Sequence, residues 1–145
     1  MTWNVSISNL KQRVELERER RRRTAEHEQH HMALWSALWQ PQDGPQSDAF
    51  HCEADQVGYG GAAGGGKTDL ALGLAIRRHR RSIIFRRAFP NARGVIERSR
   101  ELLYGHARFN EQNHLWRLGA RHTIEIGSMV DENDKFNHQG QARDL

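Results

Sequence analysis

The sequence has little cysteine, little lysine and no long apolar run. Its one cysteine, Cys52, excludes an internal disulfide, which suits a reducing compartment. No apolar run approaches the roughly 20 residues that a membrane-spanning helix needs. Residues 1–23 also lack the apolar stretch and small-residue cleavage site of a signal peptide. We therefore expect a cytoplasmic protein that has no membrane partner.

Although lysine is scarce, the chain is basic. The formal net charge is +4, and lysine occurs only at positions 11, 67 and 135, so arginine supplies most of the positive charge. Arginine favours bidentate contact with phosphate and carboxylate groups. The composition is therefore compatible with a nucleic-acid partner, while the 18 acidic residues leave other partner classes open.

Residues 9–40 predict a long helix whose first half is densely charged. Opposite charges occur at the favourable i,i+4 spacing in two pairs, Glu17 with Arg21 and Glu19 with Arg23. Apolar positions are few in this half, so little of it can be buried. We therefore expect a solvated helix there.

The second half of the same helix carries an apolar face. Met32, Trp35 and Trp39 share this face, and we expect it to dock on another surface. Three histidines precede it at i, i+3 and i+4 spacing: His27, His30 and His31. This spacing is compatible with a metal site, but it brings no acidic or cysteine partner. We favour a polar helix face.

The stretch "QPQDGPQSDA" (residues 40–49) holds two of the three prolines and predicts a turn-rich connection. We place a domain boundary within it. Residues 1–44 would form the N-terminal helix and linker, and residues 45–145 a separate α/β domain.

The second region has the pattern of an α/β domain. The stretch 55–60 predicts a short strand, and 66–79 a helix closed by basic residues that suit its dipole. The apolar run 82–85 is typical of a buried parallel strand, so these segments predict one βαβ unit.

The remainder of this region predicts one more helix and a hairpin. A helix over 91–105 should bury Val95, Ile96, Leu102 and Leu103. A hairpin should follow over 114–127, with Leu115 and Arg117 on one face and Trp116 and Leu118 on the other. Residues 128–145 read as a loop.

Between the first predicted strand and helix lies a glycine-rich loop. It fits the pattern G-x-x-x-x-G-K-[ST] at every fixed position, through Gly61, Ala62, Ala63, Gly64, Gly65, Gly66, Lys67 and Thr68. Such a loop lets backbone N–H groups approach a polyphosphate, and the helix N-terminus adds its positive dipole end. Lys67 would reach the β- and γ-phosphates, and the Thr68 hydroxyl would bind Mg²⁺. The alternative is a flexible glycine hinge. The loop alone does not choose between an ATPase, a GTPase and a kinase. A GTPase would carry a guanine-binding N-K-x-D signature, and none is present.

Four stretches in order resemble the N-terminal ATPase region of tailed-bacteriophage terminase large subunits. They are "GYGGAAGGGKTDLALGLA", "SIIFRRAFPNARGVIERSRELL", "WRLGARHTIEIGSM" and "DENDKFNHQGQARDL". The resemblance covers residues 45–145. It implies a P-loop NTPase fold, a parallel sheet with helices on both sides, in a motor that packages viral DNA using ATP and Mg²⁺.

The resemblance also implies partners and roles for single residues. The partners are double-stranded DNA, the terminase small subunit, the portal protein and further copies of the motor, in the cytoplasm of a bacterial host cell. Gln46 lies where the family places an adenine-contacting glutamine; it is otherwise an ordinary turn residue. Arg86 and Arg87 follow the strand 82–85, where an arginine would sense the γ-phosphate, contact DNA or form a structural ion pair.

The sequence departs from the family at its end. The family continues into an apolar strand closing with Asp-Glu, which binds Mg²⁺ and activates water, and then into a nuclease domain. This chain stops at Leu145, ahead of that strand. We therefore expect an incomplete P-loop NTPase, as a fragment, a split gene product or a decayed prophage remnant. Whether it is an ATPase is left undecided by the sequence. Two other readings stay open: a RecA-like ATPase or helicase fragment, and a non-catalytic basic DNA-binding or adaptor protein with a vestigial nucleotide loop.

Overall fold

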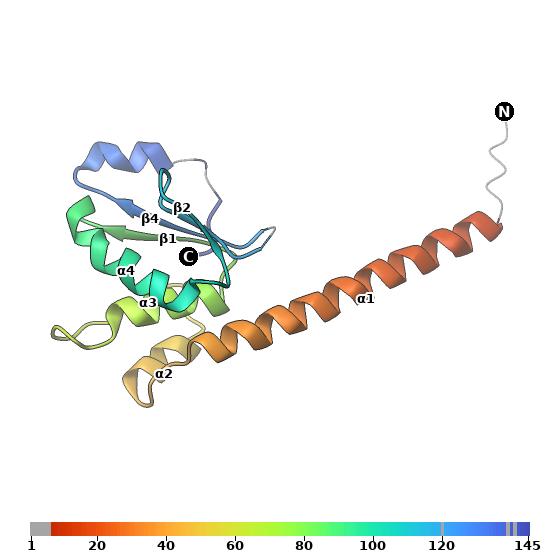
Figure 1. Ribbon diagram of the computed structural model, residues 1–145, viewed down its shortest axis with the longest axis horizontal. Helices are drawn as coiled ribbons and strands as arrows, with labels where there is room; N and C mark the ends of the chain where they lie inside the picture. Colours follow the sequence, from red (N-terminus) through yellow and green to blue (C-terminus); the bar gives the residue numbers. More distant parts are fainter. Residues whose placement is uncertain (1–6, 120, 139, 141) are drawn as a thin grey trace. The chain divides into compact units, whose positions relative to one another are not determined.

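The computed structural model describes residues 7–119, 121–138, 140 and 142–145. It divides into two units, residues 1–37 and residues 38–145, which are described separately. The first consists mainly of one helix, and the second contains the remaining helices and a mixed sheet (Figure 1). The chain is therefore an α/β protein with a long N-terminal helix.

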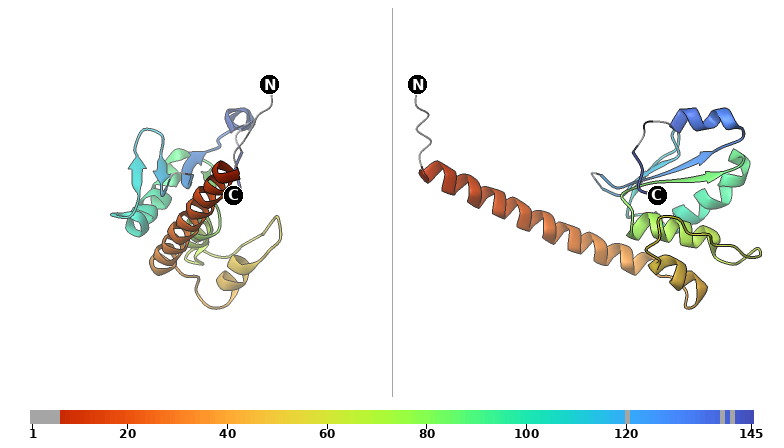
Figure 2. Two further views of the ribbon diagram at one scale, coloured as in Figure 1. Left: turned by 90° about the vertical axis from the view of Figure 1, so that its right-hand side faces the viewer. Right: turned by 180° about the vertical axis from the view of Figure 1, so that it is seen from behind.

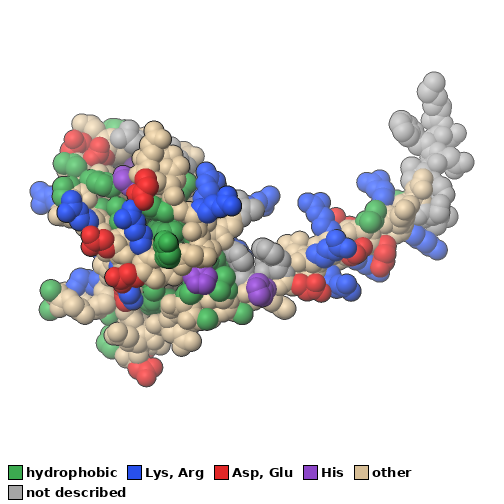
Figure 3. Space-filling view, in the orientation of Figure 1, with side chains coloured by type: hydrophobic (Ala, Val, Ile, Leu, Met, Phe, Trp, Pro, Cys, Tyr) green, Lys and Arg blue, Asp and Glu red, His purple; other side chains and the backbone are tan. Residues whose placement is uncertain are grey.

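Helix α1 extends over Ile7–Leu38, close to the predicted 9–40. Figure 3 shows basic and acidic side chains interspersed along it. Both predicted ion pairs form: Arg21 Nε lies 3.3 Å from Glu17 Oε1, and Arg23 Nη2 lies 2.7 Å from Glu19 Oε1. All four side chains are exposed, so these pairs stabilise the helix only by a few tenths of a kcal/mol each.

In its described residues, the compact unit holds three further α-helices and two short 3₁₀ helices. Their bounds are α2 (Pro45–His51), α3 (Lys67–Arg77), η1 (Phe89–Ala92), α4 (Arg93–Leu103) and η2 (Glu132–His138). Helix α2 corrects the predicted turn-rich connection. Pro45 occupies the start of the helix, where its missing N–H costs nothing, and Phe50 at the other end is buried. Likewise η2 replaces part of the predicted loop over 128–145.

The sheet has four strands in the order β1-β4-β3-β2. Their bounds are β1 (Arg81–Arg86), β2 (Arg108–Asn110), β3 (Leu115–Arg117) and β4 (Thr123–Ser128). Strands β1 and β4 pair in parallel, whereas the other two pairings are antiparallel. The sheet is therefore mixed rather than parallel. The predicted hairpin is confirmed as β3–β4, and β2 extends it by one strand.

The strand predicted over 55–60 is wrong. Residues 52–61, all of them described, form no helix or strand. Gly58 and Gly60 bring no side chain that could pack on a sheet, and most of the segment is exposed. The glycine loop therefore follows an irregular segment, and the predicted βαβ unit lacks its first strand.

Helices α3 and α4 lie on one face of the sheet, and η2 lies on the other (Figures 1 and 2). The helix side forms the core, because Ile84, Trp116, Ile124 and Ile126 are buried there. The predicted inward residues of α4 are confirmed: Val95, Ile96, Leu102 and Leu103 are all buried. The Trp116 indole donates a 2.9 Å hydrogen bond to Ser99 Oγ, which satisfies the one polar atom of that side chain.

The predicted apolar face around residues 32–39 is buried in part. Met32 is exposed. Trp39, in the compact unit, is buried with its ring centroid 5.4 Å from that of Phe50. A Cβ atom added at Gly73 would lie 2.3 Å from the Trp39 ring. Glycine is therefore required in the middle of α3, despite its cost of about 1 kcal/mol in a helix.

Candidate phosphate-binding site

The glycine loop ends at the N-terminus of α3. Gly64 and Gly66 have φ of +85° and +70°, in the left-handed region that favours glycine. Gly66 is the N-cap, and its carbonyl accepts the Leu70 N–H at 2.8 Å. The N–H groups of the first helical turn have no intrahelical acceptor. The fold thus presents backbone donors and the positive end of a helix dipole at one point.

Gln46 contacts the glycine loop at Gly66. It lies in α2, only 4% exposed. Its Nε2 donates to the Gly66 carbonyl at 3.1 Å, and its Oε1 accepts the Gln42 N–H at 2.6 Å. A Cβ atom at Gly66 would lie 2.5 Å from Nε2, so this contact also requires glycine. Gln46 is therefore a helix residue and not a turn residue. Both the nitrogen and the oxygen of its side-chain amide form hydrogen bonds with backbone groups.

Tyr59 makes a second contact that holds the loop. Its hydroxyl donates to the Gly65 carbonyl at 3.0 Å. The Gly65 N–H in turn donates to the Ala62 carbonyl at 3.3 Å, which closes a turn inside the loop. Sequence reasoning missed Tyr59, because no spacing rule links an aromatic residue to a carbonyl six positions later.

Lys67 folds back over the loop that precedes it. Its Nζ donates to the carbonyls of Gly61 and Ala62, at 2.8 and 2.6 Å. The side chain is exposed, so these bonds compete with water. An ammonium group is thereby held against the loop, where an incoming anion would exchange for the two carbonyls.

Thr68 and Arg86 are brought together by the tertiary fold. Arg86 ends β1 and points to the helix side of the sheet, where its Nη2 donates to Thr68 Oγ1 at 2.9 Å. Both residues are half-buried. Arg87 is exposed, and its side chain has no partner within the described residues. Of the two predicted arginines, Arg86 therefore lies at the loop and Arg87 does not contact it.

Asp69 in the first turn of α3 is clamped by α4. Arg98 Nε lies 2.8 Å from Asp69 Oδ1, and Arg98 Nη2 lies 3.1 Å from Oδ2. Hydrogen bonds to Asp69 and to Glu101 raise the pKa of Arg98 further above its usual range. This pair fixes the helix that carries Lys67 and Thr68. The sequence contains no signal for it, since the partners are 29 positions apart.

Metal-binding groups are sparse in the described part of the chain. No group of three or more histidine, cysteine or acidic side chains within it is placed to hold a metal ion. Of the predicted histidine set, the side chains of His27 and His31 lie outside the described residues. Thr68 is still the only residue that we predict to bind Mg²⁺. Oxygens of the nucleotide would supply further ligands. Cys52 is exposed and is not part of a disulfide.

Comparison with known proteins identifies no relative. No protein family, curated protein or solved structure matches the chain. Within the described residues, no helix combines the length and apolar character needed to cross a membrane.

Proposed function

We propose that the compact unit binds Mg·ATP through residues 61–68. The observation that carries this proposal is the position of Lys67, whose ammonium group lies against the loop carbonyls at the N-terminus of α3. A triphosphate would accept hydrogen bonds from the loop and first-turn N–H groups. Lys67 would exchange its two carbonyl partners for phosphate oxygens.

The residues around the loop fit such a ligand. Thr68 Oγ1 accepts from Arg86 and keeps a further lone pair for Mg²⁺. Arg86 lies within reach of the same phosphates, as a sensor of the γ-phosphate would. ATP supplies the transferable phosphoryl group. Gln46 acts as a support of Gly66 in this proposal; an adenine contact would have to use the remaining donor and acceptor of its amide.

We further propose that this nucleotide-binding unit belongs to a terminase large subunit, the motor that packages viral DNA. The support is the order of the quoted stretches, in which the glycine loop, the Arg86-Arg87 pair at the end of β1, the β3–β4 hairpin and an acidic segment follow one another. Double-stranded DNA, the small subunit and the portal protein are the partners this proposal requires. For this chain we propose nucleotide binding. ATP hydrolysis and DNA cleavage are activities that the resemblance implies for the whole motor.

Calorimetric titration of Mg·ATP into the full chain tests the first proposal. Lys67→Ala should weaken binding by roughly 10- to 100-fold, because it removes a charge-assisted contact worth about 1.5–3 kcal/mol. Lys11→Ala on α1 is the matched control, with the same change in charge, and should bind like the parent. Equal binding by the parent and Lys67→Ala would show that the loop is a hinge.

A second candidate function is DNA binding that is independent of nucleotide, by a protein whose loop is vestigial. Arg108 and Arg117 favour it, because they face each other on the sheet and neither side chain has an ion-pair partner within the described residues. The two functions differ in one measurement. A packaging motor should change its DNA affinity when Mg·ATP is added, whereas a protein with a vestigial loop should not.

A further inference from the structure

Three arginines lie in one row across the face of the sheet opposite α3 and α4. Arg108 on β2 is directly opposite Arg117 on β3, Arg117 is opposite Thr123 on β4, and Thr123 is opposite Arg81 on β1. Side chains alternate along a strand, and Trp116, next to Arg117, is buried in the core. The row therefore points away from the core. We call Arg108, Arg117, Thr123 and Arg81 the arginine row.

The arginines of the row form no ion pair with any acidic side chain in the described part of the chain. Arg108, Arg117 and Arg81 are exposed, and none of their side chains has an ion-pair or hydrogen-bond partner within the described residues. Like charges placed directly opposite each other destabilise a sheet. The fold therefore bears a cost at Arg108 and Arg117 that a bound anion would relieve.

The carboxylates near the row already have partners. Glu125, on the same face of β4, pairs with Arg143. Glu111, at the turn after β2, lies 2.6 Å from Arg100 of α4. At the other end of the row, the Asp144 carboxylate accepts the backbone N–H groups of Arg80 and Arg81 and partly offsets the charge of Arg81. The positive potential is therefore least compensated at Arg108 and Arg117.

A shallow hollow of about 410 Å³ lies at one end of the row. It is lined by Arg108 and Arg117, by His106, and by Gly105 and Gly119, whose lack of side chains leaves backbone groups accessible. An anionic group seated there would meet two guanidinium groups at once. Arginine forks match the oxygens of a phosphate.

We propose that the arginine row is a contact surface for the phosphodiester backbone of a nucleic acid. The four strands place its ends roughly 14 Å apart, three strand spacings. Duplex DNA carries about one charge per 1.7 Å of axis, so several phosphates fall within reach of the row. The partner class rests on the proposed function, but the surface does not depend on nucleotide binding.

This surface and the phosphate loop lie at opposite ends of the sheet. Arg81 begins β1, and Arg86, which contacts Thr68, ends it. These positions are about 16 Å apart along the strand. Their side chains also point to opposite faces, since the positions differ by an odd number. Nucleic acid and nucleotide would therefore bind without competing.

Fluorescence anisotropy with a labelled DNA duplex tests the proposal, using the full chain at salt concentrations from about 50 to about 200 mM. The double variant Arg108→Ala/Arg117→Ala should lose roughly tenfold or more in affinity, and its slope of log affinity against log salt should fall by about 2. The matched control is Arg18→Ala/Arg22→Ala on α1, which removes the same charge from exposed positions. It should bind within about twofold of the parent.

A melting curve separates a binding role from a structural one. Removing the facing charges should leave the melting temperature unchanged or raise it, because a repulsion is relieved. Arg108→Lys/Arg117→Lys should retain most of the affinity, since phosphate contacts are mainly electrostatic. A fall in melting temperature that accounts for lost binding would overturn the proposal.

Each of three results in the anisotropy assay would overturn the proposal. The parent does not bind DNA, or the Arg108→Ala/Arg117→Ala variant binds DNA like the parent, or the α1 control loses as much affinity as that variant. Lys67→Ala in the same assay without nucleotide should bind DNA like the parent. If it does so while failing to bind Mg·ATP, the nucleotide site and the arginine row are independent, and either proposal can fail without the other.

Discussion

Arginine is used in two different ways in the two units of this protein. On α1 it pairs with glutamate one turn away, as Arg23 does with Glu19. In the compact unit it reaches partners far along the chain, as Arg98 does with Asp69 and Arg86 with Thr68. The same side chain therefore neutralises a solvated helix in one unit and joins secondary-structure elements in the other.

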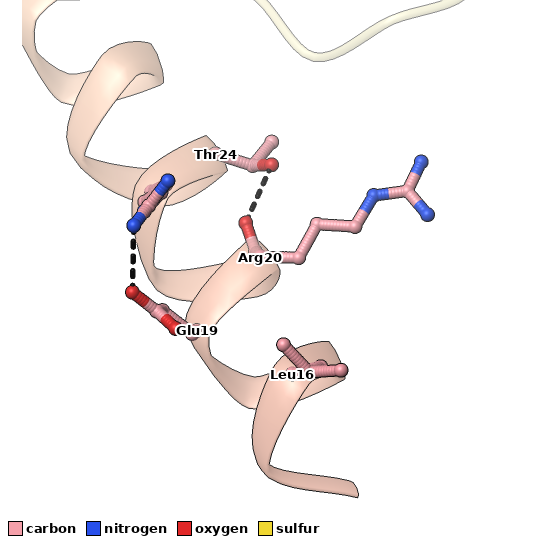
Figure 4. Close-up of a pocket in the computed structure, with 5 residues that line it drawn as sticks. Leu16, Glu19, Arg20 and Thr24 are labelled. Carbon is pink, nitrogen blue, oxygen red and sulfur yellow. Dashed lines mark hydrogen bonds and ion pairs between the residues drawn. The ribbon is translucent and has the colours of Figure 1, made fainter. Parts of the chain in front are cut away.

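This difference shows that composition does not locate a basic surface. The densest run of arginines, at residues 20–23, lies among glutamates, and several of its charges are compensated within the helix. Figure 4 shows the part of α1 around Arg20, where Thr24 Oγ1 donates to the Arg20 carbonyl at 2.9 Å and every contact drawn is local. The arginine row has fewer charges, but Arg108 and Arg117 have no ion-pair partner within the described residues, so the row is the stronger candidate for an anion.

The largest expected effect concerns tertiary packing, which the compact unit has and the solvated part of α1 lacks. Gly73→Ala should destabilise the compact unit by about 1–3 kcal/mol, because the new methyl group would overlap the Trp39 ring. In an ordinary helix the same change stabilises. Gly94→Ala in α4, where a Cβ would meet nothing within 4 Å, is the control and should be neutral or stabilising. Denaturant unfolding measures both, and a stabilised Gly73→Ala variant would contradict the observed packing.

An intermediate effect compares the two uses of arginine directly. A double-mutant cycle on Arg98 and Asp69 should give a coupling energy of about 1 kcal/mol, since the pair is bidentate but partly exposed, at 37% and 29%. The same cycle on Arg23 and Glu19 should give about 0.3–0.5 kcal/mol or less. Chemical denaturation serves for the first pair and helical circular dichroism for the second. Equal coupling energies for the two pairs would show that arginine stabilises both units to the same extent.

The smallest effect is a pH dependence at the edge of β1. Burial raises the pKa of Asp144, but hydrogen bonds from the backbone N–H groups of Arg80 and Arg81 outweigh it and leave the pKa below its usual value. Because the folded pKa is lowered, this stabilisation is present above the unfolded value near 3.9 and is lost as pH falls through the folded pKa. The melting-temperature difference between the parent and Asp144→Asn should therefore exist at neutral pH and vanish in acid. A difference that persists in acid would mean that the charge of Asp144 plays no part.

Elements with strong local signals were predictable from the sequence. Helices α1 and α4 follow from residue spacing, and the four buried apolar residues of α4 were identified because apolar side chains recur at helical intervals. The β3–β4 hairpin follows from alternation around Gly119. The pattern from Gly61 to Thr68 also marked the start of α3, since glycine ends and apolar periodicity begins there.

Elements whose existence depends on distant contacts were not predictable. Helix α2 is only seven residues long and is held by the burial of Phe50 and Gln46, so its prolines suggested a turn. Strand β2 has three residues and exists because β3 offers it an edge. The strand expected at 55–60 does not form, since an alternating pattern interrupted by glycine has too little to bury.

The sequence by itself determined the helical periodicities, the glycine content of the loop and the residue types available to bind a phosphate, because these depend on neighbours within a few positions. Only the tertiary structure decided that Gln46 supports Gly66, that Arg86 reaches Thr68 and that Arg108 faces Arg117. Strand register and helix packing set those contacts, and both result from burying one face of the sheet rather than from any local pattern.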